Sequence, residues 1–267
     1  MSRAGGRLAT YRRRERRAAP PISSTARRQR GVYIIAVAVL LGIAITLLAF
    51  GLVSDLTRRN VSDQTTAEAL EQAKQALIGY AIAYRDRIPP TGARANVWGL
   101  LPCPDVNGSG TGGEGVATAC GSKDVTVIGR LPWRTLDLPP LRDGSGECLW
   151  YALSGNFKNN PKTDLMNWDT NGLIEIMAPD ATGFVAGATP TQRAVAVIFA
   201  PGAILPGQTR SLAAINPPVV CGGNYTATNY LDAASGINNA TAASATANAL
   251  SRFIAATDSE RTPVTTD

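Results

Sequence analysis

Two short stretches of the chain carry oxygen ligands at spacings that suit a metal ion. Asp105 and Asn107 open the first stretch, and Asp169, Asn171 and Glu175 form the second. Calcium takes six to eight oxygen ligands from carboxylates, amides and carbonyls, and neither stretch supplies that many alone. Because Asp and Asn followed by glycine also form ordinary tight turns, the sequence leaves open a structural calcium ion and a pair of turns.

Cysteine offers a second kind of chemistry. The sequence contains four cysteines, and these are Cys103, Cys120, Cys148 and Cys221. An even number in an exported domain predicts two disulfides, for which three pairings exist. Sequence order favours Cys103–Cys120, which closes a glycine-rich loop, and Cys148–Cys221. The chain has no CxxC motif and no histidine, so a structural zinc site is not expected.

Catalytic groups are scarce. Without histidine, the chain cannot form a His-based triad or proton relay. Asp137, Asp143 and Glu147 could form a carboxylate pair of the glycosidase kind, although turn capping is the simpler role. The tryptophans could form a ligand-stacking surface or anchor the core and loops, and they are Trp98, Trp133, Trp150 and Trp168. We therefore predict no enzymatic activity and no catalytic residue.

The positive charge of the chain is concentrated in its N-terminal segment. Ten arginines and a single acid give residues 1–31 a charge of +9, whereas the whole chain of 267 residues carries only +6. An uncharged apolar run follows at 32–53, and as a helix it would be about 33 Å long, enough to cross about 30 Å of hydrocarbon. Arginines beside such a segment set its topology and contact anionic lipid, so we expect no nucleic acid partner.

The apolar pattern changes after residue 53 and predicts that the helix continues. Leucine and tyrosine recur at multiples of seven, and alanines lie beside them on the same helical face; these residues are Leu56, Leu70, Leu77, Tyr84, Ala69, Ala73, Ala76, Tyr80 and Ala83. We expect one helix from about Val32 to Arg87, ended by Pro89-Pro90.

Short apolar runs beyond the helix predict a small antiparallel sheet. The runs lie at 148–153, 173–178 and 194–200, are separated by turn residues, and leave little room for crossover helices. A weak helix is expected at 243–256. The predicted fold is α+β, a long N-terminal transmembrane helix packed on a small antiparallel sheet with long disulfide-stapled loops. The predicted organisation is a basic cytoplasmic leader (1–31), the transmembrane half of the helix (32–53), its amphipathic half (54–88) and an exported globular domain (89–267).

Three motifs in this order resemble the type IV pilin and type II secretion pseudopilin superfamily. The first is Arg27-Arg28-Gln29-Arg30-Gly31 followed by Val32-Tyr33-Ile34-Ile35. The second is Ala76-Leu77-Ile78-Gly79-Tyr80 through Ile88-Pro89, and the third is Asp143-Gly144-Ser145-Gly146-Glu147-Cys148-Leu149-Trp150-Tyr151. The resemblance implies cleavage after Gly31 by a prepilin peptidase and methylation of the new N-terminus at Val32. It also implies that the N-terminal helix assembles with other pilins or pseudopilins on an inner-membrane platform.

The sequence departs from the pattern of the major subunits of this superfamily. Those subunits usually have phenylalanine first and glutamate fifth in the mature chain, where this chain has Val32 and Ala36. Absence of the glutamate resembles the minor, tip-initiating members. We expect a single-pass inner-membrane protein with a cytoplasmic N-terminus and a periplasmic domain, which a surface fibre could incorporate. The alternative is an uncleaved membrane-anchored periplasmic binding domain that does not polymerise.

Overall fold

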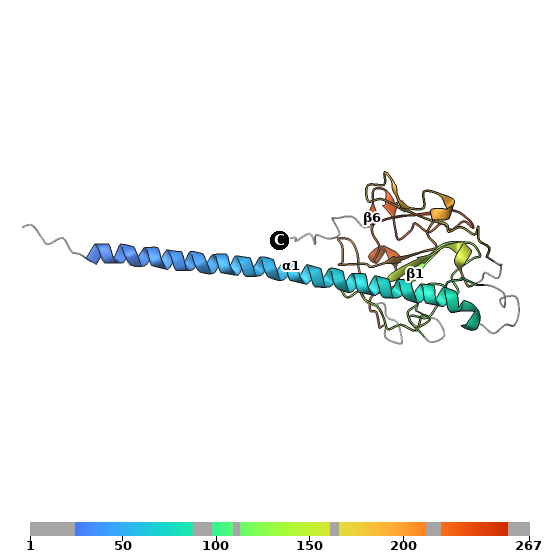
Figure 1. Cartoon of the computed structure of the whole chain (residues 1–267), viewed down its shortest axis with the longest axis horizontal. Coiled ribbons are helices and arrows are strands. Elements are labelled where there is room, and N and C mark those ends of the chain that lie inside the picture. Colours follow the sequence, from blue (N-terminus) through green and yellow to red (C-terminus); the bar gives the residue numbers. More distant parts are fainter. Residues whose placement is uncertain (1–24, 88–97, 109–112, 161–165, 212–219, 256–267) are drawn as a thin grey trace, which may run out of the picture. The chain divides into compact units, whose positions relative to one another are not determined.

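The structure is a computed structural model, and it describes residues 25–87, 98–108, 113–160, 166–211 and 220–255 (Figure 1). Within the first of these ranges, only the backbone is described at 25–32, 49–56, 85 and 87. The chain divides into two compact units, Met1–Leu56 and Thr57–Asp267. A single helix, α1, runs over Thr25–Arg87, a length of 63 residues that enters both units.

The predicted transmembrane helix, and with it the single-pass inner-membrane localisation, is wrong for the described part of the chain. Among the described residues, no helix combines the length and the apolar character needed to cross a membrane. The apolar stretch of α1 with described side chains, 33–48, has 16 residues.

The second half of α1 packs through one face into the core of the second unit. Five of its residues are buried at spacings of three and four, which place them along one side of a helix, and they are Ala69, Ala73, Leu77, Tyr80 and Tyr84. They contact a cluster of leucines and Tyr151 from the loops and the sheet. The helical face predicted from the heptad-like spacing is thus confirmed from Ala69 onward, with Leu70 and Ala76 half-buried at its edges, while the side chain of Leu56 lies outside the described residues.

The loop after residue 142 approaches α1 very closely. The backbone N–H of Gly144 donates to the Thr66 hydroxyl at 2.9 Å. A Cβ at Gly144 would lie 2.2 Å from the carbonyl oxygen of Ser62. Only glycine fits at this contact, because any side chain would collide with the helix backbone.

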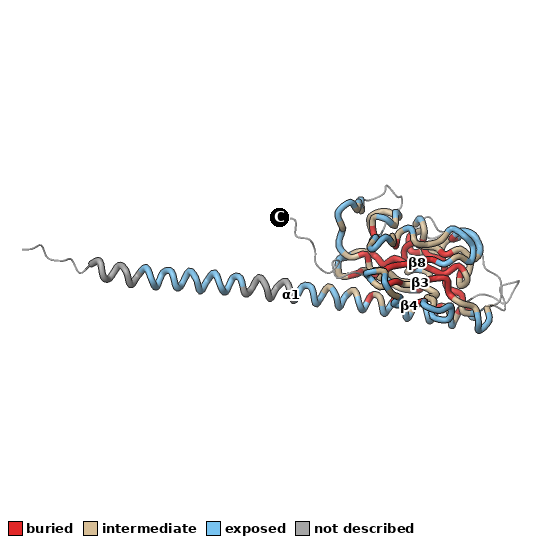
Figure 2. Tube along the Cα trace, turned by 90° about the horizontal axis from the view of Figure 1, so that it is seen from above, coloured by how far each residue is buried: buried red, intermediate tan, exposed pale blue. Residues whose placement is uncertain are grey.

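Two three-stranded sheets and a hairpin form the rest of the unit. The first sheet has the order β1-β2-β5, from Val127–Arg130, Trp150–Leu153 and Ala196–Phe199, and is antiparallel throughout. The second has the order β4-β3-β8, from Phe184–Ala186, Ile174–Met177 and Ser251–Ile254. The hairpin pairs β6, Ala233–Ala234, with β7, Ile237–Asn238. Buried residues gather around β3 and β8 (Figure 2). Three short 3₁₀ turns lie between strands, at Gly155–Phe157, Pro190–Gln192 and Ala227–Asn229.

The second sheet differs from the prediction in two ways. β3 pairs with β8 in parallel, with Ile174 opposite Ser251, so the sheet is mixed rather than antiparallel. A parallel pair requires the chain to return to the end of the sheet at which the first strand begins. The long connection between β3 and β8 gives the chain room to do so. The helix expected at 243–256 is also wrong, because Ser251–Ile254 forms β8, in which Ser251, Phe253 and Ile254 are buried and Arg252 is exposed.

Candidate functional site

The apolar half of α1 exposes its side chains on every side. Eleven large apolar residues between 33 and 48 are at least half exposed, and they are Tyr33, Ile34, Ile35, Val37, Val39, Leu40, Leu41, Ile43, Ile45, Leu47 and Leu48. The hydroxyl of Thr46 lies 3.0 Å from the carbonyl oxygen of Gly42 and 2.8 Å from that of Ile43, so it is satisfied within the helix. A helix that is apolar all round is ordinarily covered by other apolar groups. This segment, which we call the apolar helix surface, is the strongest candidate for an interaction site.

The predicted processing site lies immediately before this surface. Gly31 and Val32 belong to α1, but their side chains lie outside the described set. Ala36 is exposed on the helix. Since alanine carries no charge, this position offers only apolar contact to a neighbouring helix.

Both disulfides favoured by sequence order are present. Cys103 pairs with Cys120 across 17 residues, with 5.7 Å between their Cα atoms. Cys148 pairs with Cys221 across 73 residues, with 5.6 Å between their Cα atoms. The first closes a loop and the second ties the start of β2 to a segment near the end of the chain, so the two covalent links hold different parts of the unit. Two disulfides are typical of proteins in an oxidising compartment.

A buried lysine supports the first disulfide loop. The Lys158 side chain is fully buried, and its ammonium group donates to the carbonyl oxygens of Cys120, at 3.0 Å, and Ser122, at 2.6 Å. Burial lowers the pKa of Lys158, because the charged form loses its hydration. These contacts give Lys158 a structural role inside the loop.

The first calcium candidate holds a loop together through protein donors. Asp105 is completely buried, and its carboxylate accepts hydrogen bonds from the backbone N–H groups of Gly108, at 2.8 Å, and Gly115, at 2.7 Å. The Tyr225 hydroxyl donates to the same carboxylate at 2.8 Å. Asn107 lies in the turn between Asp105 and Gly108, and its N–H lies 3.4 Å from the Asp105 carboxylate. The geometry therefore matches the turn interpretation at this stretch.

The second calcium candidate is divided between a turn and a strand. Asp169 is exposed, and the carbonyl oxygen of Asn171 accepts a hydrogen bond from Asn156 at 3.1 Å. Glu175 lies in β3, is buried, and pairs with Arg252 at 2.9 Å and Arg193 at 3.7 Å. Across the described ranges, no group of three or more acidic, cysteine or histidine side chains is placed to hold a metal ion.

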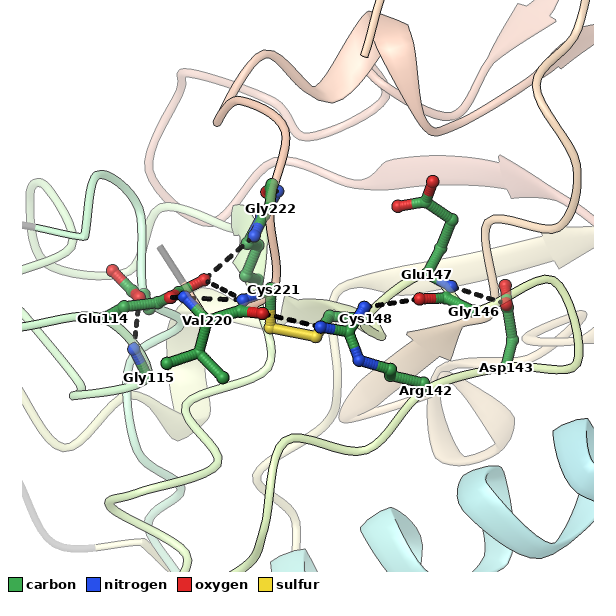
Figure 3. Close-up of a disulfide and its surroundings, with 12 residues drawn as sticks. Glu114, Gly115, Arg142, Asp143, Gly146, Glu147, Cys148, Val220, Cys221 and Gly222 are labelled. Atoms are coloured by element: carbon green, nitrogen blue, oxygen red, sulfur yellow. Dashed lines mark hydrogen bonds and ion pairs between the residues drawn. A yellow bond between two sulfur atoms is a disulfide. The ribbon is translucent and has the colours of Figure 1, made fainter. Parts of the chain in front are cut away.

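A buried ion pair beside the second disulfide was not predicted. Glu114 and Arg130 are almost fully buried and lie 3.1 Å apart. The Glu114 carboxylate also accepts hydrogen bonds from the backbone N–H groups of Val220 and Cys221 (Figure 3). Arg130 donates to the carbonyl oxygens of Gly222, at 2.7 Å, and Asn224, at 2.9 Å. This pair, which we call the Glu114–Arg130 clamp, fixes the segment after residue 219 against β1.

Two tyrosines complete the surroundings of the clamp. The Arg130 guanidinium lies 4.7 Å from the centre of the Tyr225 ring and 5.3 Å from that of Tyr230. Burial, together with the nearby charge of Asp105, raises the pKa of Tyr225 above its usual range. No local pattern could have revealed the clamp, because Glu114 and Arg130 lie 16 residues apart and the segment that they hold, at Cys221, is 107 residues from Glu114. One sequence feature could have pointed to a buried charge here, namely that the apolar stretch Val127–Arg130 ends in an arginine.

The other carboxylates considered for catalysis have structural partners. Asp143 is buried and accepts hydrogen bonds from the N–H groups of Ser145, at 2.9 Å, Glu147, at 3.0 Å, and Gly202, at 2.7 Å. Glu147 pairs with Arg210 at 3.3 Å. Asp137 has a positive φ of 57° in the turn after residue 136. The third sequence motif thus forms a capped turn at the start of β2.

Comparisons with known proteins give no relative. No family model matches the chain, and no curated protein or solved structure matches it. The features of the chain that bear on its function are therefore the apolar helix surface and the disulfide-stapled unit that carries the other half of the helix.

Proposed function

We propose that this protein is a non-enzymatic assembly subunit of the pilin or pseudopilin type, processed by a prepilin peptidase after Gly31. The observation that carries the proposal is the division of α1. Its residues 33–48 expose apolar side chains all round, whereas residues 69–84 bury one face in a disulfide-stapled unit. A helix with these two halves suits a subunit that contributes its first half to a bundle of neighbouring helices.

The chemistry of the apolar helix surface supports packing between helices. Gly42 has open space around the position of its missing Cβ, so a second helix backbone can approach there. Thr46 exposes no unsatisfied donor, since its hydroxyl lies within hydrogen-bonding distance of its own helix. Ridges of leucine and isoleucine on either side can interlock with those of a neighbour.

We assign the chain to the minor subunits because of two residues. Val32 and Ala36 replace the phenylalanine and glutamate that are usual in major members. Its partners under this proposal are a prepilin peptidase, other pilins or pseudopilins that bind through the N-terminal helix, and an assembly platform. The fibre is of the type IV pilus or type II secretion kind.

Leader cleavage tests the proposal directly. Coexpression with a prepilin peptidase should shorten the chain by about 3 kDa, as expected for removal of a leader segment. The Gly31→Val variant should remain uncut, because a branched side chain blocks access to the bond. Gly42→Val is the matched control and should be cut normally. Absence of a shift in the native chain would favour the non-polymerising binding domain.

Incorporation into an assembly is a separate measurement. All four cysteines are held in disulfides, so an Ile43→Cys variant carries a single free thiol. In a helical bundle this thiol should form intermolecular crosslinks with the corresponding position of other subunits. A chain that is cleaved but never crosslinks or co-purifies with such subunits would contradict assembly while leaving processing intact.

A further inference from the structure

Two of the four tryptophans lie on the surface of the second unit. Trp168 is 97% exposed and Trp98 is 48% exposed. In contrast, Trp150 is buried against Tyr230, with ring centres 5.1 Å apart, and the Trp133 indole packs where a Cβ at Gly115 would be. Anchoring of the core therefore accounts for Trp133 and Trp150, whereas the Trp168 indole is almost fully exposed and Trp98 is half exposed.

Trp168 is presented by a closed turn. The N–H of Thr170 donates to the carbonyl oxygen of Asn167 at 3.1 Å, and the N–H of Asn167 donates to the Thr170 hydroxyl at 3.1 Å. The same hydroxyl donates to the Asn167 side chain at 2.7 Å. These bonds already hold the backbone of the turn in place. The turn therefore loses little conformational entropy when a ligand stacks on Trp168.

The segments of Trp98 and Trp168 lie against each other. A Cβ at Gly99 would be 2.9 Å from the terminal methyl carbon of Met166. On either side, Leu101 is hydrogen-bonded to Phe157 at 2.8 Å, and Asn156 to Asn171 at 3.1 Å. We call the resulting patch the tryptophan surface, defined by Trp98, Met166, Asn167, Trp168 and Asp169.

The polar residues of this surface narrow the class of ligand. Asn167 and Asp169 are exposed beside the Trp168 indole, so amide and carboxylate groups border an aromatic face. A sugar ring matches this arrangement, because its C–H face is attracted to the negative face of an indole while its hydroxyls donate to a carboxylate. A protein partner would need a larger continuous apolar patch than two indoles and a half-buried methionine provide.

We propose that the tryptophan surface binds a neutral oligosaccharide of β-linked hexopyranose units. Such chains are ribbon-like and present flat C–H faces on which an indole can stack, with hydroxyl groups at the edges for Asp169 and Asn167. The proposal does not depend on leader processing or on assembly, since every group that carries it lies in the second unit.

Titration with defined sugars tests this proposal. The full-length chain is titrated with cellohexaose and with chitohexaose, and binding is followed by isothermal calorimetry and by tryptophan fluorescence. Trp168→Ala and Trp98→Ala should each weaken binding at least tenfold, and Trp168→Phe should retain part of the affinity. Asp169→Asn should weaken binding less than Trp168→Ala does. Phe184→Ala removes an exposed aromatic side chain elsewhere, on β4, and should bind as the native chain does.

Three outcomes overturn the proposal. One is the absence of binding of either hexasaccharide to the native chain. A second is an affinity that changes less than twofold in both tryptophan variants, with thermal unfolding unchanged. The third is self-association that requires Trp168 in sedimentation experiments without any sugar binding, which would make the patch a protein contact.

Discussion

Asp105, Glu114 and Arg130 bring two negative charges and one positive charge into the interior of a small unit. Charged groups leave water only at a high cost, which is offset where each has several hydrogen-bond partners. Here backbone N–H groups, Tyr225 and the arginine supply these partners. The individual residues therefore act mainly as connectors between distant segments, and their replacement should affect stability.

Glu114→Gln tests the clamp. The substitution leaves the buried Arg130 charge without its partner, which should lower the free energy of unfolding by about 3 kcal/mol. Urea unfolding with both disulfides intact measures this loss. Glu71→Gln is the matched control, because Glu71 pairs with Lys74 at 2.8 Å on the exposed side of α1 and should leave the midpoint unchanged. Equal effects of the two variants would contradict the role of the clamp.

Tyr225→Phe tests the consequence of the raised pKa. Below about pH 10 the phenol is protonated in both the folded and the unfolded chain, so it adds no pH dependence. Above that pH the unfolded chain releases a proton that the folded chain retains, and stability is lost as the pH rises. The native chain should be the more stable at pH 8, because the Tyr225 hydrogen bond to Asp105 is intact.

The gap between native and Tyr225→Phe chains should narrow by about 1 kcal/mol between pH 10 and pH 11. Urea unfolding of both chains at each pH gives this difference. Tyr151, whose pKa burial also raises, titrates in both chains and cancels. A gap that stays constant with pH would show that the Tyr225 phenol titrates normally in the folded chain.

At the scale of elements, α1 and the two disulfides hold the second unit together. The helix supplies a row of small and aromatic residues that pack on the sheet and loops. The disulfides fix loops that contain few regular strands. Helix packing and the disulfides thus both contribute to the stability of the unit, which in a larger domain the hydrophobic core alone would supply.

Ala73→Leu tests the packing of α1. Ala73 is completely buried, so the larger side chain has no room and should destabilise the unit by about 1–3 kcal/mol. Ala67→Leu, on an exposed position of the same helix, should have little effect. Thermal unfolding of the two variants gives the comparison, and similar melting temperatures would mean that the helix face is not closely packed.

The two disulfides should differ in their effect on stability. In a chain-entropy model a loop of 17 residues contributes about 3 kcal/mol and one of 73 residues about 4 kcal/mol. Replacing Cys148 and Cys221 by serine should therefore destabilise the chain more than replacing Cys103 and Cys120. Chemical unfolding of the two double variants measures the order. The reverse order would show that contacts inside the shorter loop, such as those of Lys158, outweigh chain entropy.

At the scale of the whole molecule, the proposed function separates two tasks between the two units. The first unit contributes the apolar helix surface, and the second contributes a stable folded body. Substitutions in the first should impair assembly without changing the stability of the second.

Ile43→Glu tests this separation. A charge in the middle of the apolar helix surface should prevent co-purification with other pilin-like subunits, because an unpaired carboxylate is costly between apolar helices. Val185→Glu places the same side chain on an exposed position of β4 and should leave assembly intact. Crosslinking yield and thermal unfolding are measured for both. Loss of assembly in both variants would point to a general effect of charge rather than to the helix.

Local patterns in the sequence were sufficient for several features of the fold. The spacing of Ala69, Ala73, Leu77, Tyr80 and Tyr84 predicts the packed face of α1, since a helical period relates residues only three or four apart. Chain order led to both disulfide pairings. The expectation of a membrane-crossing segment is wrong for the described residues. The segment that forms β8 was predicted as part of a helix because alanine-rich sequence precedes and follows its four residues.

Residue types and short spacings are enough to predict the packed helical face, to favour one of three disulfide pairings and to exclude a histidine-based mechanism. The folded structure adds the parallel pairing of β3 with β8, the contact of Glu114 with Arg130 beneath Val220 and Cys221, and the adjoining segments of Trp98 and Trp168. In each of these cases the residues are far apart along the chain. Their contacts arise from how the whole unit packs, which no local pattern encodes.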